Sequence, residues 1–142
     1  MPVSTTNLSK ASQRHSLVVV QGIPILWRSM SGGGISGDYT RDYDGGSDVA
    51  DFIPGYAEAE DIEVTCTVAP RRDLEWMRKV KAQVMKGRFT ITRQWTDANW
   101  DPVGEAEVYP NCLLTAFSNP EVSASSDPAE LTLTFATNGE AL

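Results

Sequence analysis

Several short segments of the chain alternate between apolar and polar residues. The clearest are 60–68 and 130–139, where every second side chain is apolar and most of those between are Glu or Thr. A two-residue period is typical of a strand with one buried and one solvated face. The expected buried positions are Ile62, Val64, Cys66 and Val68, then Leu131, Leu133 and Phe135; the expected polar positions are Glu63, Thr65 and Thr67, then Thr132, Thr134 and Thr137.

Three further segments are apolar enough to form strands. Residues 88–95 alternate, with Phe89, Ile91 and Trp95 on one side. Residues 15–27 predict one or two strands around a bend at 22–24. Residues 105–117 predict a strand that is broken at Pro110, because proline lacks the N–H that a sheet ladder uses.

Residues 69–87 are the single helix candidate. Pro70 suits a first helical turn, and Gly87 suits a helix end. The expected apolar stripe is Leu74, Met77, Val80 and Val84, and Glu75 with Lys79 is an expected surface ion pair. One helix among alternating strands predicts an α+β fold: mostly antiparallel sheets, arranged as a sandwich or barrel, with one flanking helix.

The segment 29–55 lacks this patterning. It holds seven glycines and five aspartates, and we expect a long irregular loop with a functional role. Residues 1–13 are polar and predict a flexible arm. With 142 residues in all, the chain has the size of a single domain, residues 1–142.

Charge is distributed unevenly along the chain. The net charge is −7, which disfavours a grip on nucleic acid because phosphate binding needs clustered Lys and Arg. Residues 38–63 hold nine acids and one base, whereas 71–93 hold eight of the twelve bases. Two interpretations stay open: two solvated faces, or a self-complementary surface on which the acids meet Arg71, Arg72, Arg78 and Lys79 of another copy.

Most site chemistry is disfavoured by context. The glycines at 32, 34 and 37 spell G-x-G-x-x-G, but no helix pattern follows to bind a pyrophosphate. Asp42 and Asp44 are not followed by the remaining ligands of a calcium loop, and His15 is the only histidine. We therefore expect no catalytic residues, no metal and no cofactor. The first 16 residues lack the apolar core of an export signal, so Cys66 and Cys112 are expected to be free thiols.

Three runs taken in order resemble bacteriophage tail tube proteins, a family shared with contractile injection machines. They are "GGGISGDYTRDYDGGSDVADFIPGYAEAEDIEVTCTVAPRRDLEWM", "GRFTITRQWTDANWDPVGEAEVYPNCLLTAF" and "AELTLTFATNG". The resemblance spans residues 17–139 and consists of the order and patterning of the elements. It includes no catalytic signature.

The resemblance implies an assembly. Six protomers would close a ring, their sheets would join into a continuous barrel, and rings would stack into a hollow tube in a virion tail, assembled in the host cytoplasm. DNA would pass through the lumen without specific binding, and tape measure, tail terminator and baseplate proteins would be further partners. The implied lumen residues are Glu63, Thr65, Thr67, Glu107, Thr132 and Thr134, and the implied inter-subunit loop contains Gly32, Gly33, Gly34, Asp38, Asp42, Asp44, Gly45, Gly46 and Asp48.

Two alternatives remain from the sequence. One is the inner tube of a contractile bacteriocin or injection system, which has the same architecture. The other is a monomeric β-sandwich binding module in which Trp95 and Trp100 form a ligand platform.

Overall fold

The fold is described from a computed structural model, which covers residue 10 and residues 12–43, 45–46, 48–124 and 126–138. Its elements are, in chain order, β1 (Ser16–Val20), β2 (Ser29–Ser31), β3 (Ile35–Tyr43), β4 (Ala50–Ala59), β5 (Ile62–Thr67), α1 (Pro70–Lys81), β6 (Arg88–Trp95), β7 (Glu107–Ser118) and β8 (Glu130–Ala136). Six strands form one antiparallel sheet in the order β1-β6-β7-β8-β5-β2, and β3 and β4 pair separately. The prediction of mostly antiparallel strands with one helix is confirmed.

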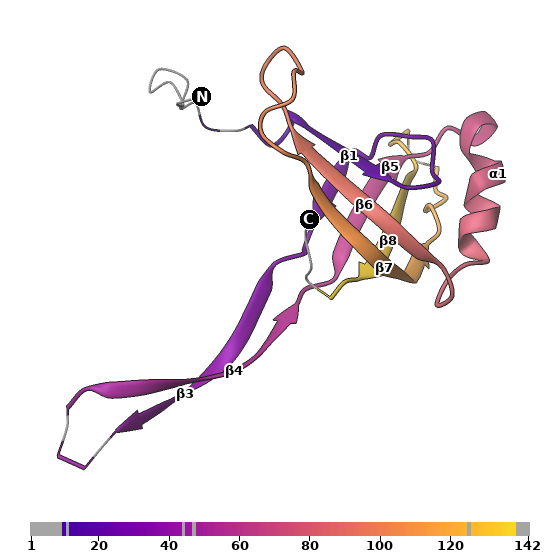
Figure 1. The fold of residues 1–142 in the computed structure, drawn as a ribbon. Coiled ribbons are helices and arrows are strands. Elements are labelled where there is room, and N and C mark those ends of the chain that lie inside the picture. Colours follow the sequence, from indigo (N-terminus) through magenta and orange to yellow (C-terminus); the bar gives the residue numbers. More distant parts are fainter. Residues whose placement is uncertain (1–9, 11, 44, 47, 125, 139–142) are drawn as a thin grey trace.

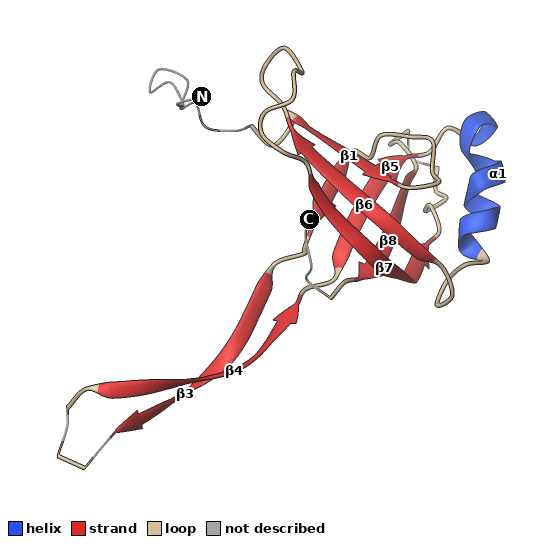
Figure 2. Ribbon diagram, viewed as in Figure 1, coloured by secondary structure: helices blue, strands red, loops and turns tan. Residues whose placement is uncertain are grey.

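The six-stranded sheet curls around the core, and α1 lies at one side of it (Figure 1; Figure 2). Alternating positions point into the curl, as the sequence pattern predicts for β5 and β8. Ile62, Val64, Leu133 and Phe135 are fully buried there. Hydrophobic burial along these strands is the main force that holds the curl together, at roughly 25 cal/mol for each Å² of apolar surface removed from water.

The helix begins at Pro70 as predicted, but a different face of it is buried. The buried residues are Asp73, Trp76, Met77 and Val80, whereas Leu74 is 56% exposed. The predicted stripe is therefore wrong at Leu74, because the helix directs Asp73 and Trp76 toward the core instead. The helix also ends at Lys81, before the predicted end at Gly87, and Val84 is partly buried in the turn that follows.

The predicted break at Pro110 is a bulge instead. Strand β7 continues through it, with Asn111 at φ 54°. Phe89 pairs with Cys112 and Ile91 with Tyr109, so two residues of β7 oppose one residue of β6. Of the described strands, the segment 15–27 contains only β1. The chain then returns toward β1, and the Trp27 N–H donates to the Val18 carbonyl oxygen at 3.0 Å.

The expectation of an irregular loop over 29–55 is wrong. The segment contains β2, β3 and the first part of β4, and β3 and β4 form a two-stranded hairpin that projects from the curled sheet (Figure 1; Figure 2). Nine residues of β3 extend it by about 30 Å. Every residue of β3 is exposed, as is nearly all of β4, so the hairpin has no core of its own.

Candidate functional site

One face of the hairpin is aromatic. Tyr39, Tyr43 and Phe52 are each more than half exposed, and the Tyr39 and Phe52 rings meet edge to face at 5.5 Å. The Arg41 guanidinium lies 5.7 Å from the Tyr39 ring centre and 5.8 Å from that of Phe52. It also donates a hydrogen bond to the Tyr39 hydroxyl at 3.3 Å. Arg41 is therefore held on this face.

The other face of the hairpin carries acids. Asp42 and Asp51 occupy directly opposed positions on β3 and β4. Like charges placed opposite each other destabilise an antiparallel pair. The single base of the hairpin strands is Arg41, whose side chain lies on the aromatic face, because successive strand residues point to opposite faces. The acidic face thus has no cation of its own.

Glycine is required at the base and in the middle of the hairpin. A Cβ on Gly32, whose φ is +85°, would lie 1.8 Å from the Asp61 carbonyl oxygen. A Cβ on Gly37 would lie 2.9 Å from the Tyr56 carbonyl oxygen, next to a shift in the pairing register. These positions fix how the hairpin leaves the sheet and how it twists.

The predicted inter-subunit residues lie along this hairpin. Gly32, Gly33 and Gly34 are at its base, Asp38 and Asp42 are in β3, and Gly45, Gly46 and Asp48 are in the connection to β4. The structure brings them together as one projecting element. Asp44 lies outside the described residues.

A polar wall covers the outer face of β2, β5 and β8. Its members are Ser29, Ser31, Glu63, Thr65, Thr67, Thr132 and Thr134. The hydroxyls of Thr65 and Thr132 are 3.2 Å apart and share a hydrogen bond. Glu63 and Thr67 are exposed, and Thr65, Thr132 and Thr134 are half-buried. Five of the six predicted lumen residues therefore share one continuous face.

Glu107 is the exception, and its placement on that face is wrong. It lies opposite Arg93 on the inner side of the sheet, the side of Ile91 and Tyr109. Its carboxylate forms an ion pair with Arg93 and accepts a hydrogen bond from the Tyr109 hydroxyl at 3.1 Å. Burial of the hydroxyl, together with the Glu107 contact, raises the pKa of Tyr109.

The predicted basic surface is only partly available. Arg71, Arg72, Arg78 and Lys79 are all exposed on α1. Arg72 is bound to Asp73 at 2.7 Å, and Lys79 lies 3.6 Å from Glu75, as predicted for that pair. Arg71 and Arg78 form no ion pair with any described side chain.

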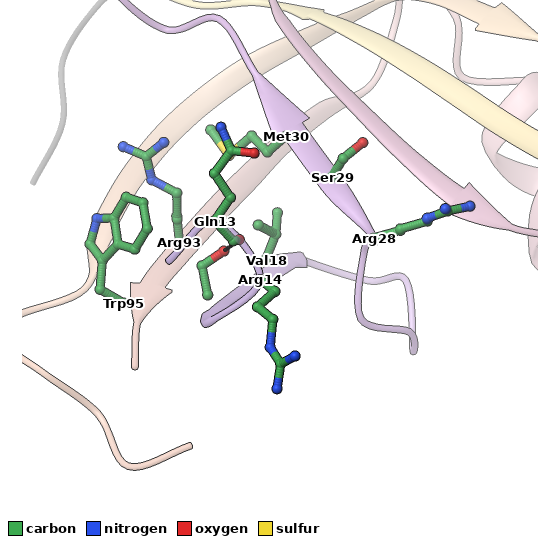
Figure 3. Close-up of a pocket in the computed structure, with 9 residues that line it drawn as sticks. Gln13, Arg14, Val18, Arg28, Ser29, Met30, Arg93 and Trp95 are labelled. Atoms are coloured by element: carbon green, nitrogen blue, oxygen red, sulfur yellow. Dashed lines mark hydrogen bonds between the residues drawn. The ribbon is translucent and has the colours of Figure 1, made fainter. Parts of the chain in front are cut away.

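Sequence reasoning missed a pocket between the two edge strands of the curled sheet. Its volume is about 510 Å³, and Figure 3 shows its lining residues, which come from β1, β2, β6 and the residues just before β1. Arg14, Arg28 and Arg93 are three of them, and Val18, Met30 and Trp95 provide apolar surface. No sequence motif marks it, because it is formed by segments far apart in the chain.

The remaining expectations concern thiols, metals and tryptophans. Cys66 and Cys112 are buried and unpaired as predicted, and burial raises the pKa of the Cys66 thiol to about 11. The described residues contain no cluster of metal-ligating side chains, and none of their helices is long and apolar enough to span a membrane. Trp95 lies beneath the Arg93 guanidinium, whereas Trp100 meets His15 edge to face at 5.2 Å.

The fold is similar to that of several solved structures. A chain from the PVC sheath–tube complex of an extracellular contractile injection system, in its extended state, is 20% identical with a TM-score of 0.78, over 99% of this chain and 97% of that one. A chain from the tube-terminating cap of the anti-feeding prophage is 19% identical with a TM-score of 0.75, over 97% and 91%. A type six secretion system protein is 14% identical with a TM-score of 0.58, over 89% and 88%.

At these identities the comparisons establish the fold, which is that of the tube proteins of contractile injection systems. The resemblance noted in the sequence is confirmed at this level. No protein-family model and no curated protein matches the chain.

Proposed function

We propose that this protein is the structural subunit of a hollow tube, built from stacked hexameric rings. The observation that carries the proposal is the combination of a tube-protein fold along nearly the whole chain with a projecting hairpin that has no core. A lone two-stranded hairpin is marginally stable in water. An exposed hairpin of this length is best explained by neighbouring copies that cover it in the assembly.

The curled sheet supplies a suitable lumen wall. In the proposed ring, the outer face of β2, β5 and β8 lines the bore, so that Glu63, Thr65, Thr67, Thr132 and Thr134 face the channel. Sixfold repetition turns each Glu63 into a ring of six negative charges. The few acids of this wall repel polyanions weakly, and the wall has no clustered bases that would bind them. Such a wall suits a conduit. Glu107 is excluded from this wall by its position on the inner side of the sheet.

The similar structures support an injection-system tube as the form of this assembly, because the PVC and anti-feeding prophage complexes are of that type. A phage tail tube that conducts DNA is the second candidate, favoured by the sequence resemblance and by the acidic wall. In either case the partners at the tube ends would be terminator and baseplate proteins, and a tape measure protein would fill the lumen during assembly. A terminator complex and a baseplate are among the similar structures.

A hairpin deletion tests the proposal. Ile35 and Ala59 face each other across the base of the hairpin, so residues 36–58 can be replaced by two glycines without stretching the chain. Both the wild-type protein and this variant are concentrated and examined by size-exclusion chromatography and negative-stain microscopy. We expect stacked rings or tubes from the wild type, and a folded monomer or single unstacked rings from the variant, with an unchanged thermal melt.

Two results would contradict the proposal. A wild-type chain that stays monomeric at every concentration would refute a tube subunit. Tubes formed equally well by the deleted variant would refute the role of the hairpin in stacking.

A further inference from the structure

The acidic face of the hairpin lacks a counterion within its own chain. Asp42 and Asp51 face each other across β3 and β4 and repel. Each lies one residue from the end of its strand at the hairpin tip. Arg41 is turned to the aromatic face by its contacts with Tyr39 and Phe52. Like charges at directly opposed positions disfavour strand pairing, and a base from outside would relieve this repulsion.

The pocket between β1 and β2 offers such a base in Arg14, whereas its Arg28 is already paired with Glu130 at 2.7 Å. Arg14 is exposed and forms no ion pair with any described side chain; its Nε donates to His15 Nε2 at 3.2 Å. Arg93 is bound to Glu107 through one terminal nitrogen, but its Nε is buried without a hydrogen-bond partner among the described atoms. A buried donor that stays unsatisfied destabilises the fold.

The pocket also suits the aromatic part of the hairpin tip. Val18 of β1, Met30 of β2 and Trp95 of β6 supply its apolar lining (Figure 3). A volume of about 510 Å³ admits a few side chains. The unpaired Arg78 of α1 also borders a hollow, but that hollow is smaller, at about 230 Å³.

A hairpin cannot fill the pocket of its own chain. The segment that enters β1, which borders the pocket, lies at the top of Figure 1, whereas the hairpin runs away from the sheet toward the bottom. The hairpin tip and the pocket between β1 and β2 are thus separate surfaces of the same chain. A contact of this head-to-tail kind, repeated from copy to copy, produces an open-ended assembly when it does not close on itself.

We propose that the arginine-lined pocket between β1 and β2 receives the acidic hairpin tip of a second copy of this chain. The inference rests on the proposed tube and identifies the receptor surface within it. Asp42 and Asp51 of one copy meet Arg14 at the pocket rim of the next, and the tip covers the apolar side chains behind it. This assignment replaces the helix bases as the surface that complements the acids.

Charge reversal at both surfaces tests the receptor. Arg14→Glu and Asp51→Arg are made singly and together, with Arg78→Glu on α1 as the matched control, because Arg78 is an equally exposed and unpaired arginine. The readout is the critical concentration for tube formation, measured by sedimentation, with a thermal melt to verify folding. We expect each single change to raise the critical concentration about tenfold or more, as close charge pairs across interfaces do, and the double change to restore most of it.

The control decides between the two basic surfaces. A normal critical concentration for Arg78→Glu supports the pocket. If Arg14→Glu forms tubes as the wild type does, the receptor assignment is overturned, and a loss in Arg78→Glu would then assign the role to α1. Absence of tubes from the wild type itself would instead refute the proposed function, so the two failures are distinguishable.

A disulfide trap gives a second measurement that does not depend on charge. Arg14→Cys and Asp51→Cys are placed in one chain, in which Cys66 and Cys112 are buried and slow to oxidise. Mild oxidation of assembled protein should yield covalent ladders of dimers, trimers and longer chains. A ladder with Arg78→Cys and Asp51→Cys, and none with the pocket pair, would overturn the assignment.

Discussion

Asp73 is the residue whose loss should most weaken the attachment of α1 to the sheet. Its side chain is fully buried, and its carboxylate accepts hydrogen bonds from the Ala69 N–H and the Trp76 indole N–H, each at 2.9 Å. Arg72 donates to it from Nε at 2.7 Å and from a terminal nitrogen at 3.0 Å. The carboxylate thereby joins the first turn of the helix to the indole ring that packs against Trp27.

The magnitude follows from these contacts. The Arg72 hydrogen bonds, with those from Ala69 and Trp76, lower the pKa of Asp73 from 3.8 to about 2. A difference of this size corresponds to about 2 kcal/mol of folding free energy. Asp73→Ala also leaves the buried Trp76 indole N–H without an acceptor, at about 1–3 kcal/mol. Ala69 is exposed, so its N–H can bond to water instead. Because the Trp76 hydrogen bond also contributes to the pKa difference, the two figures overlap, and we expect Asp73→Ala to lose about 3 kcal/mol of the roughly 5–15 kcal/mol of a typical domain.

The assay is urea unfolding followed by tryptophan fluorescence. Arg72→Ala is the control, because it removes the exposed partner and leaves the Trp76 indole bound to the carboxylate; it should cost less. Asp73→Asn should fall between the two. An Asp73→Ala variant within 1 kcal/mol of the wild type would refute the reasoning.

The same residue predicts an acid dependence. Because the folded-state pKa of Asp73 lies below its unfolded value, its contribution is fully present above about pH 4 and is lost as the pH falls through about 2. Asp73→Asn should flatten the decline in stability over that interval. An identical decline in the two proteins would show that other carboxylates cause it.

Three further predictions concern the wall, the hairpin and the thiols. Glu63→Lys should keep the free energy of unfolding within about 0.5 kcal/mol, since the position is exposed, and should make assembled tubes retain short DNA at low salt; failure to assemble would instead place Glu63 at an interface. Amides of β3 and β4 should exchange rapidly in the monomer and slowly in tubes, as hydrogen exchange with mass spectrometry will detect; equal protection in both states would contradict docking of the hairpin. Cys66 and Cys112 should react with a thiol reagent only after denaturation, because both are buried and burial raises the pKa of each; labelling of the native protein within minutes would contradict this.

The alternation of β5 and β8 determined their inner and outer faces from sequence alone. Each strand keeps a strict two-residue period without a bulge between Ile62 and Thr67, so the pairing of Thr65 with Thr132 follows the pattern. The burial of Cys66 and the start of α1 at Pro70 follow from equally local rules.

Local rules failed where the tertiary structure shifts the register or rotates an element. The bulge at Pro110 places both Tyr109 and Cys112 on the inner side of the sheet, three positions apart, and so moves Glu107 to the face opposite the one expected. In α1 the buried face includes Asp73, whose carboxylate accepts a hydrogen bond from the Trp76 indole N–H, while Leu74 is exposed. Neither effect is encoded in the spacing of apolar residues.

The hairpin and the pocket were decided by the tertiary structure for different reasons. The hairpin buries almost nothing, so its strands carry no apolar period that a sequence pattern could reveal; it is held by backbone pairing and by glycines such as Gly32 that permit a close approach. The pocket joins residues near 14, 28 and 93, which meet only when the sheet curls and brings its edge strands together. The sequence by itself thus determined which strand faces are buried, whereas the tertiary structure determined which polar surfaces are presented to another copy.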